Sequence, residues 1–180
     1  QHPNIVYRQE AAEYSSLGDH SLDLLTVGQA AHWFDHEKFY VEARRVLRPG
    51  GLLALVGYNL LKIDYPIDAM INHFYRTVLG EYWDSERRHV DMAYRSLPFP
   101  FPEIMLPVMH MTYTWTFDHL IGYLGTWSAV QHFTQQQGRS PIHQGFLDAI
   151  RSVWPEGQTK AVRFPIFGRI GHYSGTVSNL

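Results

Sequence analysis

Residues 22–59, LDLLTVGQAAHWFDHEKFYVEARRVLRPGGLLALVGYN, decide the fold of this chain. The run 22–27 is rich in aliphatic side chains and predicts a short strand that is buried on both faces. The run 52–56 has the same character and predicts a second such strand. Strands of this kind are typical of parallel sheets, in which a crossover connection must join each strand to the next.

The segment between the two runs carries the signals of a crossover helix. Asp35 is a favourable N-cap, and Glu37 places a negative charge in the first turn, where the helix dipole stabilises an anion. Apolar side chains recur at helical spacing along residues 37–47, and the sequence PGG at 49–51 stops the helix. Strand, helix and strand make a right-handed βαβ unit, so we predict an α/β fold with two adjacent parallel strands.

This unit indicates where a ligand would bind, because the ligands of open α/β sheets lie beyond the carboxyl ends of the strands. The first strand ends at Gly28, and the small side chains near it let a ligand approach the backbone closely. His32 and Trp33 add a titratable ring and a large stacking surface at the same edge. Asn59 follows the second strand. His32 and Trp33 are therefore the catalytic candidates, and Asn59 is a candidate for a substrate contact.

These residues carry a resemblance to a known family. The stretch LDLLTVGQAAHWFD at 22–35, followed by FYVEARRVLRPGG at 39–51, resembles the second half of a class I S-adenosylmethionine-dependent methyltransferase. It is most similar to the branch that includes trans-aconitate methyltransferase-like proteins. The resemblance implies a Rossmann-like sheet, an inserted helical lid with the substrate site, and a terminal antiparallel hairpin. It also implies S-adenosylmethionine as the cofactor and a small-molecule acceptor, with a carboxylate as the acceptor in this branch.

The resemblance assigns the cofactor contacts. The turn at residues 10–13 corresponds to the end of a strand beside the adenine, where the family often has an acidic residue at the position held here by Ala11. The backbone N–H of Ala12 or the carboxylate of Glu10 could substitute for it. Gln29 would contact the methionine part through its backbone. The candidate cofactor contacts are Glu10, Ala11, Ala12, Gly28, Gln29 and Ala30.

The glycine-rich turn with an acidic partner, which the family places before its third strand, is not found in the sequence. Residues 4–9, NIVYRQ, resemble that third strand, and two strands of the family's sheet would lie between 4–9 and 22–27. We therefore expect either further chain upstream or a second molecule that covers an exposed sheet edge. We also expect these 180 residues alone to bind S-adenosylmethionine very weakly.

We predict that the rest of the chain forms a helical insertion followed by the edge of the sheet. We expect residues 1–60 to belong to the cofactor-binding core, 61–157 to form a mostly helical lid, and 158–180 to form the hairpin. The predicted elements are a helix along 67–82, a shorter one along 90–97, a stiff connector at 98–102, an extended piece at 108–117, helices at 117–124 and 129–137, a helix that begins at the cap Ser140-Pro141 and runs to 153, and strands at 160–167 and 172–178.

The lid contains an aromatic set that is either lid core or a substrate pocket: His110, Tyr113, Trp115, Tyr123 and Trp127. Trp115 and Trp127 flank turn signals and are the substrate-binding candidates. A carboxylate acceptor needs no general base, and a lid arginine could orient it through a bidentate pair. The lid arginines are Arg76, Arg87, Arg88 and Arg95. If the acceptor is a hydroxyl or an amine, His32 is the nearest candidate base.

The amino-acid composition limits the kinds of ligand and partner that we expect for this chain. The formal net charge of −2 gives no basic surface of the kind that binds nucleic acid. The absence of cysteine excludes disulfides and thiolate-bound metals, and the histidines show no HExxH pattern, so we predict no metal site. No apolar run has the length of a membrane helix. We expect a cytoplasmic protein that acts on a small molecule.

Two other classes stay open. A non-catalytic or truncated methyltransferase-like module would keep the second half of the fold and act through partners, and the missing glycine-rich turn favours it. A nicotinamide oxidoreductase rests only on the shared βαβ topology. The pair of Tyr58 and Lys62 has dehydrogenase spacing but falls at a strand end, where the two side chains do not share a helical face.

Overall fold

The computed structural model describes residues 2–175. These residues form two compact units, which are described separately here. Unit 1 contains residues 2–57, 92–107 and 167–175, and unit 2 contains residues 58–91 and 108–166. No helix among the described residues is long and apolar enough to cross a membrane.

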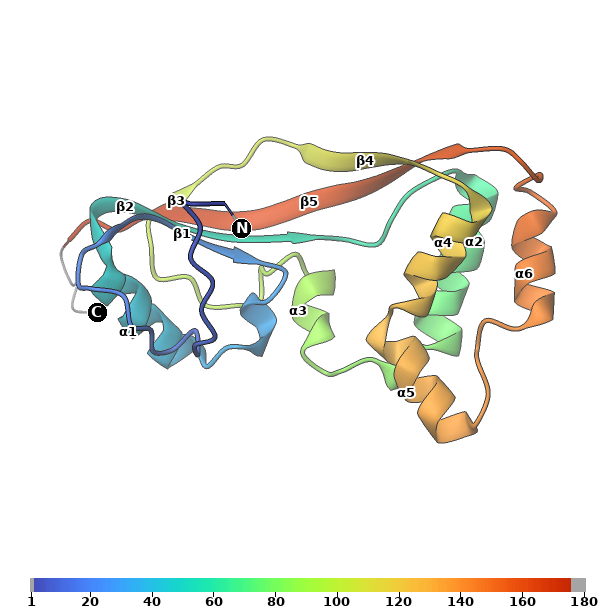
Figure 1. Ribbon diagram of the computed structural model, residues 1–180, viewed down its shortest axis with the longest axis horizontal. Helices are drawn as coiled ribbons and strands as arrows, with labels where there is room; N and C mark the ends of the chain where they lie inside the picture. The colour runs from blue at the N-terminus through green and yellow to red at the C-terminus, as the bar shows by residue number, and fades with distance from the viewer. Residues whose placement is uncertain (1, 176–180) are drawn as a thin grey trace. The chain divides into compact units, whose positions relative to one another are not determined.

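Unit 1 contains the predicted βαβ unit (Figure 1). Strand β1 (Leu22–Gly28) lies parallel to β2 (Leu47–Tyr58), with Leu24 opposite Leu52 and Thr26 opposite Ala54. Helix α1 (His36–Val46) connects them, and its N-cap Asp35 accepts a hydrogen bond from the Lys38 N–H. The prediction of two adjacent parallel strands joined by a helix is confirmed. Strand β2 begins earlier than the sequence indicates, because Leu47 already pairs with Leu22.

The prediction that the first strand is buried on both faces is wrong. Leu24 is 51% exposed, and Val27 is the one buried residue of β1. The order of strands is β1-β2-β5-β3, so β1 has a hydrogen-bonded neighbour along one edge only among the described residues. An edge strand has fewer neighbours to cover its side chains, and it leaves backbone groups open to pairing.

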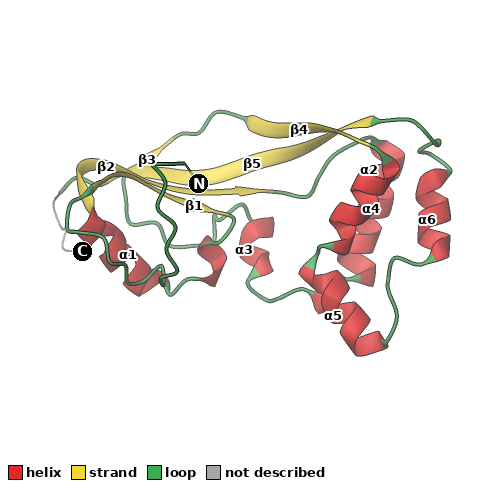
Figure 2. Ribbon diagram, in the orientation of Figure 1, coloured by secondary structure: helices red, strands yellow, loops and turns green. Residues whose placement is uncertain are grey.

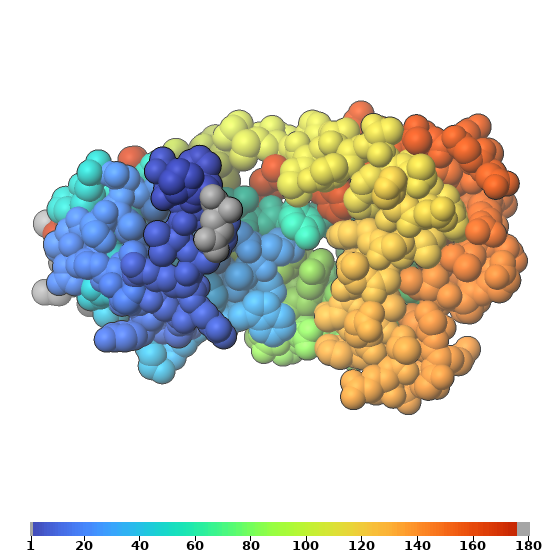
Figure 3. Space-filling model, in the orientation of Figure 1, coloured from blue at the N-terminus to red at the C-terminus, as the bar shows by residue number. Residues whose placement is uncertain are grey.

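The predicted strand at residues 4–9 is also wrong. This segment has no regular structure, and Val6 and Tyr7 are each 74% exposed. In Figure 3 the N-terminal residues, coloured dark blue, lie on the surface of unit 1. A strand needs a hydrogen-bonded neighbour, and β propensity alone does not form one. The local sequence therefore predicted a strand that has no partner among the described residues.

The C-terminal hairpin is a third wrong prediction. Residues 160–172 form one continuous strand, β5 (Lys160–His172), and residues 176–178 of the predicted second strand lie outside the described residues. In unit 1, β5 pairs antiparallel with the short strand β3 (Glu103–Ile104). Gly168 and Gly171 do not form a turn. A Cβ atom would lie 2.6 Å from the Leu55 carbonyl oxygen at Gly168 and 2.8 Å from the Phe101 Cβ at Gly171, so both glycines permit close packing.

Unit 2 combines helices with the other half of β5 (Figure 2). Strand β4 (Met109–Trp115) pairs antiparallel with residues 160–166. The helices are α2 (Tyr65–His73), α3 (Arg87–Asp91), α4 (Phe117–Gly125), α5 (Ser128–Gln137) and α6 (Gln144–Arg151). The apolar faces of α2, α4, α5 and α6 form one core. The extended piece at 108–117 and the helices at 117–124 and 129–137 are thus confirmed within a residue or two.

Three helix predictions need correction. The pattern along 67–82 continues beyond α2 as a π-helical turn (Phe74–Val78) and a 3-10 turn (Gly80–Tyr82). The helix predicted along 90–97 ends at Asp91. The helix predicted from Ser140 begins at Gln144, because the His143 ring accepts the Phe146 N–H while the Ser140 hydroxyl accepts the Ile142 N–H in a local turn.

Replacing Gly168 by alanine tests the close approach of β5 to β2. The new Cβ would meet the Leu55 carbonyl oxygen, so we expect Gly168→Ala to lower the free energy of unfolding by about 1–3 kcal/mol. Gly122 is the control: it lies in α4 with no atom within 4 Å of an added Cβ. Gly122→Ala should raise stability by up to about 1 kcal/mol, since alanine favours helix. Urea denaturation measures both, and equal stability of Gly168→Ala and wild type would contradict the packing argument.

Candidate functional site

The sequence-predicted site residues fall into both units. Unit 1 holds the catalytic candidates His32 and Trp33 together with every cofactor candidate, and unit 2 holds the three substrate candidates. A cavity lies at the carboxyl end of β1 in unit 1.

The unit 1 cavity has a volume of about 300 Å³. Four cofactor candidates line it: Ala11, Ala12, Gly28 and Ala30. Most of the remaining wall is apolar, and its residues come from β1, α1 and the loops beside them: Ser15, Leu17, Leu25, Thr26, Val27, Phe34, Phe39, Glu42 and Val46. Gly28 faces open space, with no atom within 4 Å of an added Cβ. The small residues therefore leave room where β1 ends.

Gln29 makes the turn at the end of β1. Its φ is +53°, a left-handed conformation that is uncommon for a residue other than glycine, and its N–H donates to the Val56 carbonyl at 2.7 Å. Its side-chain oxygen lies against Gly57, where an added Cβ would be 2.6 Å away. Gln29 does not line the cavity. Strained backbone of this kind occurs often at binding and catalytic sites.

His32 and Trp33 lie in the short 3-10 helix that follows (Ala31–Trp33). His32 is buried and its ring centroid is 4.8 Å from that of Trp33, while Trp33 is 56% exposed. The Nδ1 atom of His32 lies 3.2 Å from the Tyr94 hydroxyl. Tyr94 is fully buried and, like Ala93, has a positive φ. Tyr94 is not predictable as a partner from local sequence patterns, because 62 residues separate it from His32.

Glu10 lies outside the cavity wall. Its carboxylate accepts hydrogen bonds from the Ser16 N–H and hydroxyl, and these bonds lower the pKa of Glu10 below its usual value. The carboxylate at the cavity is Glu42 on α1, which the sequence analysis treated as part of the helix only. The sequence does contain an indication that Glu42 is buried. It falls three residues after Phe39 and four before Val46, within the apolar stripe of the helix.

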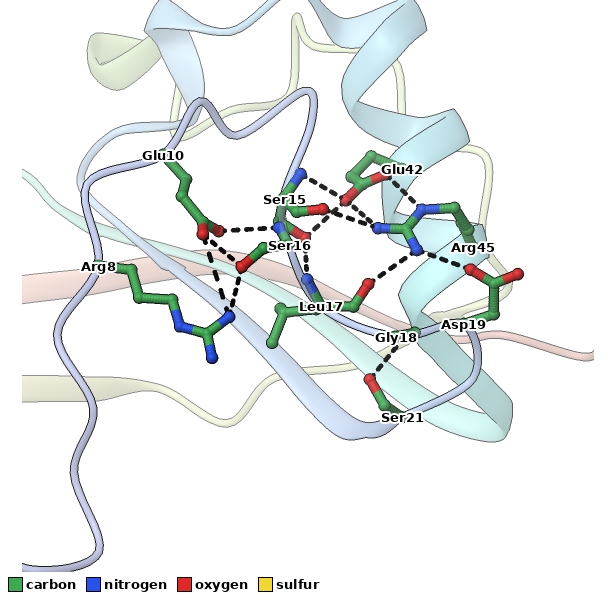
Figure 4. A network of polar contacts seen from close by, with 10 residues as sticks. All are labelled: Arg8, Glu10, Ser15, Ser16, Leu17, Gly18, Asp19, Ser21, Glu42 and Arg45. Carbon is green, nitrogen blue, oxygen red and sulfur yellow. Dashed lines mark hydrogen bonds and ion pairs between the residues drawn. The ribbon is translucent and has the colours of Figure 1, made fainter.

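Glu42 is held by a polar network (Figure 4). Its Oε1 accepts bonds from the Ser15 N–H at 2.8 Å and the Ser15 hydroxyl at 2.6 Å, and Arg45 donates to both carboxylate oxygens at 2.7 and 2.8 Å. Arg45 also donates to the carboxylate of Asp19 and to the carbonyl of Leu17. Arg45, followed by Ser15, lowers the pKa of Glu42 to about 2 against the effect of burial. Glu42 is therefore ionised and fixes the loop that lines the cavity.

The substrate candidates of unit 2 have different surroundings. Trp115 lines a cavity of about 260 Å³ whose other walls are also aromatic or sulfur-containing side chains. Trp127 is buried in the core, with ring centroids of Trp83 at 5.5 Å and Tyr123 at 5.9 Å. Asn59 is half-buried, and its backbone N–H donates to the Pro165 carbonyl at 2.9 Å.

Three of the four lid arginines border another unit 2 cavity, of about 320 Å³: Arg76, Arg87 and Arg88, beside Asp84 and Asp91. Arg95 belongs to unit 1. The Arg87 guanidinium stacks over the Trp83 ring at 5.0 Å, and its Nε donates to the Tyr75 hydroxyl at 3.0 Å. Burial raises the pKa of Tyr75 to about 12. Within residues 2–175 there is no group of three or more side chains suited to hold a metal ion.

Comparisons with known proteins agree on one family. A family model described as "Methyltransferase domain" matches residues 1–55. A solved structure named as a type II methyltransferase from Anaeromyxobacter dehalogenans is 39% identical and superimposes with a TM-score of 0.88 over 96% of this chain and 73% of that one.

Curated relatives carry the same family name. A methyltransferase of Dictyostelium discoideum is 32% identical over 170 residues, which is 91% of this chain and 65% of the relative. An uncharacterized methyltransferase of Mycobacterium tuberculosis is 46% identical over 54 residues, which is 30% of this chain and 22% of the relative. The chain thus spans less than two thirds of the length of these curated relatives.

Acid titration tests the role of Glu42. Its pKa is lower in the folded protein, about 2, than the ordinary 4.5, so its stabilisation is complete above about pH 5 and is lost as the pH falls toward 2. We expect Glu42→Gln to lower the free energy of unfolding at pH 7 by about 1.5–3 kcal/mol, and the deficit to close on acidification. Chemical denaturation at pH 7, 5, 4 and 3 measures it.

The control for this titration is Glu37→Gln, an exposed glutamate in the first turn of the same helix. It should keep the pH dependence of the wild type. A Glu42→Gln variant with unchanged stability at pH 7, or with a deficit that stays constant down to pH 3, would contradict the role given to the network.

Proposed function

Because this chain belongs to the class I S-adenosylmethionine-dependent methyltransferases, we propose that it serves the transfer of a methyl group from S-adenosylmethionine to a small molecule. S-adenosylmethionine supplies a methyl group on a positively charged sulfur, which a nucleophile takes in an in-line displacement. In such a reaction the protein mainly positions the two reactants and excludes water.

The observation that carries the proposal is the unit 1 cavity. It lies at the carboxyl end of β1, where α/β folds bind their ligands, and small residues from two separate loops border it. Sites for small molecules have volumes of about 300–1,000 Å³, so this cavity of about 300 Å³ suits a part of the cofactor. The apolar side chains of Leu25, Phe34 and Phe39 fit the flat face of the adenine ring.

The chain's own residues have distinct roles in this proposal. Ala11, Ala12, Gly28 and Ala30 allow the cofactor to approach the backbone, and Glu42 keeps the first two in place through Ser15. Neither Glu10 nor Gln29 lines the cavity. Their part in the proposal is to hold the loops that shape the site, and they do not contact the cofactor. The exposed ring of Trp33 offers a surface that covers the reactants.

His32 has a more restricted role. Its Nδ1 is engaged with the Tyr94 hydroxyl, which fixes the orientation of the ring. A carboxylate acceptor needs no base, and His32 then serves to hold Trp33. For a hydroxyl or amine acceptor, the imidazole of His32 is the candidate proton acceptor.

We propose unit 2 as the acceptor-binding unit. Arg87 favours a carboxylate, since a guanidinium held by stacking can orient a carboxylate through paired hydrogen bonds. Trp115 and Asn59 are the other candidate contacts, and Trp127 supports them from the core. The net charge of −2 supports a small molecule over a nucleic acid as the partner.

A second candidate function keeps the fold without catalysis, as a module that acts through partners. The exposed apolar side chains of Ile5, Val6 and Tyr7 favour it, because a contiguous apolar surface often marks a protein contact. Incubation of the protein with S-adenosylmethionine and a series of small carboxylates separates the two candidates. Formation of S-adenosylhomocysteine, detected by mass spectrometry, supports the enzyme.

Filling the unit 1 cavity tests where the cofactor binds. We expect Ala12→Phe to weaken the binding of S-adenosylhomocysteine at least tenfold, because the added ring occupies the space between the loop and β1. Isothermal titration calorimetry, with competition against a weaker ligand where binding is tight, measures the affinity. Ala69→Phe, an exposed substitution in α2, is the matched control and should bind as the wild type does. Unchanged binding by Ala12→Phe would place the cofactor elsewhere.

A further inference from the structure

Unit 2 contains an open cavity that is bordered mainly by aromatic rings. Its six lining residues are Tyr58, Met111, Tyr113, Trp115, Tyr123 and Phe164, and its volume is about 260 Å³. We refer to these six residues as the aromatic box. They come from four elements: the end of β2, strands β4 and β5, and helix α4.

The sheet and one helix build the box. Met111, Tyr113 and Trp115 alternate along β4 and therefore share one face of the sheet. Met111 lies directly opposite Phe164 on β5, so Phe164 presents its ring to the same face. Helix α4 follows β4 immediately and brings Tyr123 over this face, with its ring centroid 5.3 Å from that of Trp115.

Phe164 forms the floor of the box. It is 3% exposed, and four rings stand steeply on it, with interplanar angles of 83° for Tyr58, 79° for Tyr113, 66° for Trp115 and 77° for Tyr123. Their centroids lie 5.4–6.0 Å from the centroid of Phe164. Rings that rise from a common floor make the walls of a container.

The box lies at the edge of the aromatic core of unit 2, to which Phe164 belongs. Core side chains pack at the density of an organic crystal and leave few voids larger than a water molecule. Trp127, Phe74 and Tyr75 are packed in this way and are buried. The walls of the box are partly exposed, with Tyr113 at 47%, and they border an open space of about 260 Å³, many times the volume of a water molecule. This space is therefore open to a ligand.

The chemistry of the walls selects the ligand. All six residues are uncharged, and five of them present π systems, whose faces are negative. Burial raises the pKa of Tyr123 to about 12, so its phenol stays neutral at physiological pH. With no lysine or arginine in the wall, a carboxylate or phosphate group would find no counter-charge. A compact organic cation would be surrounded by aromatic side chains without a competing positive charge in the wall.

We propose that the aromatic box binds a small methylated ammonium group. Such a group is large and weakly hydrated, fills apolar space with its methyl groups, and is attracted to the faces of several rings at the same time. The proposal concerns unit 2 alone. The box shares Trp115 with the acceptor contacts of the proposed function. Binding of a cation to the box needs neither a cofactor nor methyl transfer, so a failure of choline binding and a failure of methyl transfer are separate results.

Two probes of the same shape separate attraction to a cation from simple filling of apolar space. Choline carries a trimethylammonium group, and 3,3-dimethylbutan-1-ol replaces its nitrogen by carbon and is uncharged. We expect choline to bind at least tenfold more tightly, a difference of about 1.4 kcal/mol. We also expect an upfield shift of its methyl protons from the surrounding rings. Calorimetry gives the affinities, and NMR gives the shift.

Equal or tighter binding of the uncharged probe would overturn the proposal and assign the box to neutral apolar ligands. Tighter binding of phenol than of choline would likewise overturn it, in favour of a flat aromatic ligand. Absence of choline binding at concentrations up to roughly 50 mM would also overturn it.

Variants locate the bound cation. Tyr113→Leu keeps an apolar side chain at a half-exposed position, so the unit should remain folded while one ring face is lost. We expect it to weaken choline binding about threefold to tenfold and to leave the uncharged probe nearly unchanged. Tyr65→Leu, an exposed tyrosine on α2 outside the box, is the matched control and should bind choline as the wild type does. Equal effects of the two variants would overturn the assignment to the box.

Discussion

The geometry of unit 1 depends on the buried carboxylate of Glu42. The N-terminal segment forms no strand, so no ladder of backbone hydrogen bonds positions it. Two donors of Ser15 and the guanidinium of Arg45 satisfy Glu42 instead, and Arg45 also holds the carbonyls of Ser15 and Leu17. Loss of the partners would leave a charge buried without compensation, at a cost of several kcal/mol. The network therefore places the wall that carries Ala11 and Ala12.

The end of β1 shows how a second wall is made rigid. The parallel pairing with β2 fixes the Gln29 N–H on the Val56 carbonyl, and the left-handed turn there sends the chain into the 3-10 helix. His32 is then locked by the hydroxyl of Tyr94, whose own ring meets Phe167 edge-on at a centroid distance of 5.0 Å. Residues distant in sequence thus hold the loop that follows β1, which suits a site that must position its ligands accurately.

Unit 2 uses the same side-chain type for two purposes. Trp127 and Tyr75 pack face and edge into the core, where their area stabilises the helices. Trp115 and Tyr113 stand on a sheet face that α4 covers only in part, so their rings border a space instead of filling it. The difference arises from the partners that each ring meets, because the aromatic side chains themselves are alike. The strand alternation of β4 decides which rings face that space.

The sequence by itself determined the parallel βαβ unit, the cap at Asp35 and the helices α4 and α5, because periodicity and caps act over a few neighbouring residues. Only the tertiary structure decided the rest. Residues 4–9 lack a partner strand, and Gly168 permits close packing where the sequence indicated a turn. Glu42 at the cavity, Tyr94 beside His32 and Phe164 beneath the aromatic box all depend on contacts between distant segments. Local patterns carry no information on such contacts, since burial, pairing and charge compensation are fixed when the segments meet.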